Sequence, residues 1–211
     1  MKNTLVLLVS ASIFFGFTSC KSDSTEKLEL LESPTQACFY SYNEGATKFQ
    51  WTAFKTTEMV GVSGTFNRVK VTSDTSDDPM GVLKSMSFKM ETSSVETNNE
   101  DRNKKVAKHF FETINTPVIS GKVLSINEEI GECRIEVTMN DLSVEVPGDY
   151  SFINNVFTFE SSVDVTSWNA LSGITALNRV CKELHTGADG VSKLWTEIQL
   201  SFKTKLKSDC E

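Results

Sequence analysis

The sequence predicts an all-β protein of antiparallel strands with short helices. The main observation is an alternation of apolar and polar residues with a period of two, which recurs in six segments of the 211-residue chain. A strand with this pattern has one dry face and one wet face, as the strands of an antiparallel sheet do. The second observation is that clusters of turn-forming residues separate several of these segments.

Each alternating segment is expected to form one strand. The segments comprise residues 49–53, 62–66, 86–90, 133–139, 157–165 and 198–206. Turns are predicted at residues 72–81, at residues 147–149 and at the pair Asn154-Asn155.

Two segments are predicted to be helices instead. Residues 98–111 are polar with a narrow apolar stripe, and residues 170–184 carry apolar residues at helical spacing. The strands, each with one apolar face, could pack as a sandwich or close into a barrel. Periodicity alone does not distinguish these two architectures.

The first twenty residues have the features of an export signal. Lys2 precedes an apolar run over residues 4–17, which is too short to span a bilayer. The run ends in Phe-Thr-Ser-Cys, and small residues before Cys20 resemble the lipobox of bacterial lipoproteins, whose signal is cut before an acylated cysteine. We therefore predict a lipoprotein signal peptide at residues 1–19 and a polar tether at residues 20–37 after lipidated Cys20. An ordinary signal peptide with Cys20 incidental is the alternative.

Composition argues against several classes of function. A net charge of −7 and a pI near 5.0 argue against nucleic acid as a partner, because phosphate binding needs a basic face. His109 and His185 are the two histidines of the sequence, and the GxSxG, HExxH and P-loop motifs do not occur in it. The acidic segment 74–78 is interpreted as a solvated turn, because its spacing does not match a calcium loop. We expect no catalytic residue, no metal and no cofactor.

A longer pattern extends across residues 92–123. A strand ending in small hydroxyl residues, a polar helix, paired Phe and a Pro before the next strand follow one another, and this order resembles the YceI-like family of exported, lipocalin-like barrels. The residues that fit the family there are Asn99, Arg102, Phe110, Phe111 and Pro117. Segments 61–66 and 140–143 also fit, and the resemblance covers roughly residues 39–207. The family's usual histidines near the first strands are replaced here by segment 51–55, so ligand identity is the least transferable property.

The resemblance implies that residues 38–211 form a YceI-like domain, an antiparallel lipocalin-like β-barrel of about eight strands that holds an isoprenoid or other lipid chain. The side chains expected to line its lumen are Phe49, Trp51, Phe66, Met86, Phe88, Met90, Val137, Met139, Phe157, Phe159, Ile198, Leu200 and Phe202. Phe brings no hydroxyl that needs a partner, and Met is flexible enough to fit varied shapes. The alternative is a core filled by these side chains, in a structural or interaction lipoprotein without a ligand.

The four cysteines of this domain are candidates for disulfides, because an exported protein folds in an oxidising compartment. The first and last strands of the implied barrel are antiparallel neighbours, which favours Cys38–Cys210 and leaves Cys133–Cys181. Free thiols are the alternative. The segment 185–190 is expected to be a structural loop, with gating of a barrel mouth as the other interpretation.

These features together predict a lipoprotein of the bacterial cell envelope. Lipidated Cys20 would hold it on a membrane, and the domain would face the periplasm or the cell surface. Its expected partners are that membrane and a lipophilic small molecule, either an isoprenoid or a fatty chain. The identity of the ligand and the formation of a homodimer are left open by the sequence.

Overall fold

The computed structural model describes residues 37–210. The predicted signal peptide, Cys20 and the tether up to residue 36 lie outside the described residues. In chain order the described elements, with single-turn 3-10 or π helices labelled η, are β1 Cys38–Ser41, η1 Glu44–Ala46, β2 Thr47–Lys55, β3 Val60–Phe66, β4 Val69–Thr72, α1 Pro79–Lys84, β5 Ser87–Glu91, η2 Thr92–Ser94, β6 Val95–Glu96, α2 Glu100–Val106, η3 Ala107–Phe111, β7 Val118–Asn127, β8 Glu132–Met139, β9 Leu142–Ile153, β10 Val156–Asp164, η4 Val165–Trp168, α3 Leu171–Val180, η5 Lys182–His185, β11 Leu194–Lys205 and β12 Lys207–Cys210.

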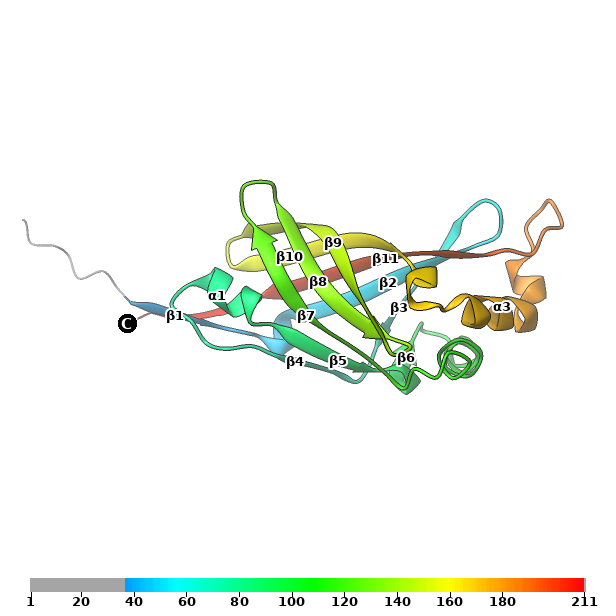
Figure 1. Ribbon diagram of the computed structural model, residues 1–211, viewed down its shortest axis with the longest axis horizontal. Coiled ribbons are helices and arrows are strands. Elements are labelled where there is room, and N and C mark those ends of the chain that lie inside the picture. Colours follow the sequence, from blue (N-terminus) through cyan, green and yellow to red (C-terminus); the bar gives the residue numbers. More distant parts are fainter. Residues whose placement is uncertain (1–36, 211) are drawn as a thin grey trace, which may run out of the picture. The chain divides into compact units, whose positions relative to one another are not determined.

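Most of these strands belong to one curled sheet. Within residues 37–210, ten strands pair antiparallel in the order β4-β5-β7-β8-β9-β10-β11-β2-β3-β6 and curl into a half-barrel (Figure 1). The predicted all-β, lipocalin-like antiparallel class is therefore confirmed. The number of strands exceeds the expected eight because short strands such as β4 and the two-residue β6 extend the sheet at its edges.

Hydrogen bonds between two chain corners hold the edges of this sheet together. The Asn67 amide donates to the Ser94 carbonyl (2.9 Å), and the Arg68 amide donates to the Ser94 hydroxyl (2.9 Å). The Glu91 amide donates to the Arg68 carbonyl (3.0 Å). The corner between β3 and β4 is thus joined to the corner between β5 and β6, which helps the sheet to curl.

The two predicted helical segments are both helical. Residues 98–111 form α2 and the π-helical turn η3, and Asn99 begins α2 by accepting a hydrogen bond from the Arg102 amide (2.9 Å). Residues 170–184 form α3 and most of η5. In Figure 1, α3 lies at the end of the half-barrel away from β1, while α1 lies near β1.

The predicted turn at residues 147–149 is wrong, because these residues lie inside β9. β9 pairs with β10 only from Asp149 to Ile153, so Pro147 lies before this ladder, and the Ser161 hydroxyl donates to the Pro147 carbonyl (2.6 Å). The backbone groups of Pro147 thus face the side where the β9–β10 ladder has ended. A proline is tolerated there because its missing N–H removes no ladder bond.

The other two turn predictions had different outcomes. Asn154 and Asn155 have φ values of 52° and 62° and connect β9 to β10, as a two-residue type I′ hairpin turn requires. That prediction is confirmed. Residues 72–81 contain the start of α1, which was not expected. Asp78 caps α1 by accepting a hydrogen bond from the Met80 amide (2.9 Å), and Pro79 occupies the first helical position.

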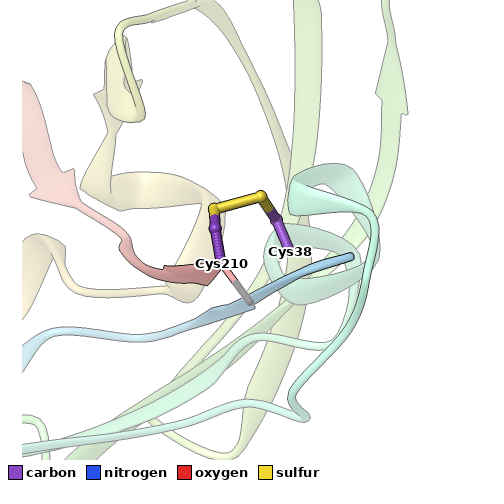
Figure 2. The surroundings of a disulfide bond; sticks show 2 residues. All are labelled: Cys38 and Cys210. Carbon is purple, nitrogen blue, oxygen red and sulfur yellow. A yellow bond between two sulfur atoms is a disulfide. The ribbon is translucent and has the colours of Figure 1, made fainter. Parts of the chain in front are cut away.

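A disulfide joins the two ends of the described chain. In the separate β1–β12 sheet Cys38 lies directly opposite Cys210, and the two are bonded (Figure 2). Their Cα atoms are 4.0 Å apart although 172 positions separate them in the sequence. The Cys38–Cys210 prediction is therefore confirmed, and β2 and β11 are likewise antiparallel neighbours.

The predicted Cys133–Cys181 disulfide is wrong, because both residues are buried free cysteines. Cys133 lies near the start of β8, whereas Cys181 follows α3. The opposite end of β8 lies near the start of α3, because the Trp168 indole donates to the Val137 carbonyl (2.9 Å). From Cys133 to the end of β8 at Met139 the strand runs for about 20 Å, which separates the two thiols.

Candidate ligand-binding cavity

The inner face of the half-barrel surrounds a cavity of about 1000 Å³. Small-molecule sites commonly have roughly 300–1,000 Å³, so this cavity is large for the class. Inward-facing Phe49, Trp51 and Phe202 line it and keep part of their surface accessible. Large apolar side chains in a filled interior would be buried completely. The interior is therefore hollow, in contrast to the filled core considered as an alternative.

The register of the strands arranges the lining side chains in transverse rows. Residues that are directly paired in neighbouring strands point to the same face of the sheet. Across β10, β11, β2 and β3 the successive rows are Phe159–Phe202–Phe49, Ser161–Leu200–Trp51–Gly64 and Val163–Ile198–Ala53–Val62. The first row is aromatic and the third consists of smaller aliphatic side chains. From Phe49 to Lys55 the wall follows β2 for about 20 Å, so the cavity is elongated.

The strands on the other side of the sheet complete this wall. Their rows are Val71–Phe88–Gly121–Val137 and Val69–Met90–Ile119. A Cβ atom on Gly121 would overlap the Phe88 ring and the carbonyl of Glu136. Glycine at this position therefore lets the Phe88 ring lie against the neighbouring strand.

All thirteen side chains that the sequence predicted for the lumen lie on the wall of this cavity. They are Phe49, Trp51, Phe66, Met86, Phe88, Met90, Val137, Met139, Phe157, Phe159, Ile198, Leu200 and Phe202. Alternation placed them correctly because each segment has one inward face. Their contact with a ligand stays a prediction.

Sequence reasoning missed the helical part of the wall. The cavity is also lined from α2, η3 and α3 by Val106, Phe110, Phe111, Ile174 and Leu177. The rings of Phe49 and Phe66 are 6.2 Å apart between centroids, and those of Phe66 and Phe111 are 5.8 Å apart, so sheet and helix form one aromatic surface. The helical stripes were visible in the sequence, but a stripe does not tell which part of the sheet it covers.

The polar groups of Thr47 and Trp51 on the cavity wall differ in whether they have a hydrogen-bond partner. The hydroxyls of Thr47 and Thr204 hydrogen-bond to each other (2.7 Å), and Thr204 is fully buried. Trp51 Nε1 is a buried donor for which the described residues supply no acceptor, and its indole lies over Gly64, where a Cβ atom would overlap it. Such an orphaned donor calls for an explanation, and a ligand in the cavity would be one source of an acceptor.

His185 lies on the cavity wall just after α3. Its Nδ1 is 2.9 Å from Asn178 Oδ1, which also accepts a hydrogen bond from the Ser192 hydroxyl (3.3 Å). Burial lowers the pKa of His185 to about 4, and the nearby positive charge of Lys55 adds to the effect. The imidazole is therefore neutral at neutral pH.

The remaining reactive groups give no sign of catalysis or metal binding. Burial raises the pKa of Cys133 to about 11, which keeps its thiol protonated and a poor nucleophile. Across residues 37–210, no three His, Cys, Asp or Glu side chains lie close enough together to hold a metal ion. Among the helices of the same range, none is long and apolar enough to cross a membrane.

Comparison with known proteins identifies the family. The YceI-like domain matches residues 40–206, which is most of the chain. The chain belongs to the YceI-like family. The predicted resemblance to this family is thereby confirmed, and the YceI-like domain coincides with the half-barrel described above.

Solved structures share the fold of this YceI-like chain at low sequence identity. A polyisoprenoid-binding domain from Saccharophagus degradans implicated in plant cell wall breakdown is 12% identical, with a TM-score of 0.55, over 83% of this chain and 99% of that domain. BcnA from Burkholderia cenocepacia is 15% identical, with a TM-score of 0.53, over 80% of this chain and 99% of its own. A search of curated proteins gave no significant match.

Proposed function

We propose that this YceI-like protein binds and carries a long apolar chain, either an isoprenoid or another lipid tail, in its cavity. The observation that carries the proposal is the elongated cavity of about 1000 Å³, whose wall is built from rows of apolar side chains. Transfer of apolar surface from water into such a wall contributes about 25 cal/mol per Å². The polyisoprenoid binding stated for the Saccharophagus degradans domain supports the same class of ligand.

The proposed role is binding without catalysis. The wall offers few groups that could do chemistry, because Cys133 is protonated and His185 is held by Asn178 without a carboxylate partner. A structural lipoprotein with a filled core is the less favoured function, since Phe49, Trp51 and Phe202 line open space.

The test is lipid extraction and mass spectrometry of the protein without its anchor. We would express the chain from residue 20 with Cys20→Ala behind a cleavable secretion signal, so that Cys38–Cys210 can form. We expect a lipophilic molecule to co-purify, and the delipidated protein to take up geranylgeraniol at about one molecule per chain. Repeated recovery of empty protein that takes up neither isoprenoid nor fatty probes would contradict the proposal.

We further propose that acylated Cys20 anchors the protein to a membrane of the bacterial envelope, with the domain in the periplasm or at the surface. The support is the lipobox-like sequence before Cys20. Each buried methylene of an acyl chain contributes about 0.8 kcal/mol, so several chains give stable attachment.

Replacing Cys20 by Ala is expected to move the protein from the membrane fraction to the soluble fraction, because the acceptor of the acyl chains is lost. Fractionation of cells followed by immunoblotting measures the distribution. Ser19→Ala serves as a control, since it keeps a small residue before the cysteine and should leave the protein on the membrane. Unchanged membrane retention of the Cys20→Ala protein would refute the anchor.

A further inference from the structure

We propose that His185 Nε2 is a hydrogen-bond acceptor for the polar end of the bound chain, and that the ligand is therefore an isoprenoid or fatty alcohol. The inference rests on the proposed lipid-binding function and specifies the ligand within that class. It starts from the position of His185 on the cavity wall, where the residue keeps 9% of its surface accessible. The wall leading to it is apolar along β2 and β11, so a chain lying there would bring its end group to this histidine.

The hydrogen bonds around His185 determine which ring nitrogen carries the proton. Asn178 Oδ1 can only accept, and it lies 2.9 Å from Nδ1, so Nδ1 must donate. The Ser192 hydroxyl donates to the same oxygen (3.3 Å), so Oδ1 is the Asn178 atom that both His185 and Ser192 contact. In a neutral imidazole with the proton on Nδ1, Nε2 carries a lone pair.

Nε2 has no partner among residues 37–210, and the backbone holds the ring where it is. The His185 amide donates to the Cys181 carbonyl (3.0 Å), and the His185 carbonyl accepts from the Lys193 amide (3.0 Å). Lys55 also fixes this segment, because its ammonium donates a hydrogen bond to the Leu184 carbonyl (2.9 Å). His185 is thus held in place on a cavity wall that is otherwise mostly apolar.

An acceptor selects ligands that can donate. A phosphate ester, an ionised carboxylate or a quinone carbonyl presents lone pairs to Nε2 and cannot satisfy it. A hydroxyl donates to Nε2 and can in turn accept from Lys55, which lines the same cavity. A ligand whose end group cannot donate would leave Nε2 without a hydrogen bond and would bind less tightly. The site therefore favours an alcohol over these other ligands.

The test compares geranylgeraniol with its methyl ether, which keeps the oxygen but has no proton to donate. Affinities are measured by titration with the Cys20→Ala chain. We expect the alcohol to bind about tenfold more tightly than the ether. His185→Leu should reduce this ratio to about one, whereas the control His109→Leu, at a position outside the cavity wall, should keep it.

Each outcome separates this inference from the proposed function. Uptake of neither probe by the reference protein would overturn both. Equal affinity for the two probes, or a preference kept by His185→Leu, would overturn the role of His185 and leave lipid binding in place. Tighter binding of geranylgeranyl diphosphate than of geranylgeraniol would likewise overturn the alcohol assignment.

A spectroscopic measurement covers the case in which His185→Leu does not fold. With two histidines in the chain, the ¹⁵N resonances of His185 can be assigned with the His109→Leu variant. In the ligand-free protein Nε2 should resonate as an unprotonated, pyridine-type nitrogen. Geranylgeraniol should shift this resonance toward that of a hydrogen-bonded nitrogen, and the methyl ether should not. An Nε2 that does not respond to the alcohol, or that already carries the proton, would refute the proposal.

Discussion

Ala53→Trp is expected to weaken binding of a long apolar ligand about ten- to a hundredfold while the protein stays folded. Ala53 belongs to the row Val163–Ile198–Ala53–Val62, which carries small side chains on the cavity wall. An indole at this position would occupy space that the ligand needs. Overlap of this kind costs about 1–3 kcal/mol, and 1.4 kcal/mol corresponds to a factor of ten in Kd. Titration with geranylgeraniol measures the loss.

Thr52→Trp is the matched control for this substitution. Thr52 precedes Ala53 on the same strand, and its hydroxyl hydrogen-bonds to that of Ser63 on the exposed face of the sheet (2.9 Å). Adding the same indole on that face should leave the affinity within about twofold of the original value. Thermal unfolding of both variants verifies that they fold. An Ala53→Trp protein with undiminished affinity would place the ligand outside the cavity.

Loss of the Cys38–Cys210 disulfide is expected to reduce the free energy of unfolding by about 3–5 kcal/mol. The bond closes a loop with a sequence separation of 172, and the chain-entropy estimate for a loop of this length is about 5 kcal/mol. The double variant Cys38→Ser with Cys210→Ser removes the bond, and denaturant unfolding measures the change. The midpoint of thermal unfolding should fall by on the order of 10 °C.

Reductant provides the control for the disulfide. It should destabilise the unchanged protein to the level of the double variant and should leave the double variant unaffected. Cys133 and Cys181 are free thiols in both, so they do not contribute to this difference. A stability loss below about 1 kcal/mol would mean that the bond hardly restricts the unfolded chain.

Alternation revealed the inner face of the sheet because it has the same period as the strand. Phe157 and Phe159 could thus be assigned to the interior from their spacing, and the structure places both on the cavity wall. Reasoning from turn-forming residues failed at Pro147, where composition favours a turn but the chain forms a strand. A strand is possible there because Pro147 lies in the part of β9 that does not pair with β10. This depends on a contact between distant segments, which a local sequence pattern does not show.

The candidate polar site could not be predicted for a similar reason. His185 was visible as one of two histidines, but its role depends on Asn178, on Ser192 and on the approach of Lys55 from β2. These residues come from three parts of the chain, and the contact with Asn178 determines which ring nitrogen is protonated. Whether the apolar face was filled or hollow also depended on the curvature of the sheet, which the one-dimensional pattern does not specify.

The pairing of the earliest strands with the latest ones has a consequence for how the chain folds. The Thr47 hydroxyl on β2 hydrogen-bonds to the Thr204 hydroxyl on β11, 157 residues away. In the same way, β1 can pair with β12 only after the end of the chain has been made. The entropy of closing such long loops must be lost before these contacts form, which makes folding slow. While the chain is being made, the edge of β2 that pairs with β11 has no partner. The growing chain is therefore exposed to aggregation until its final strand emerges.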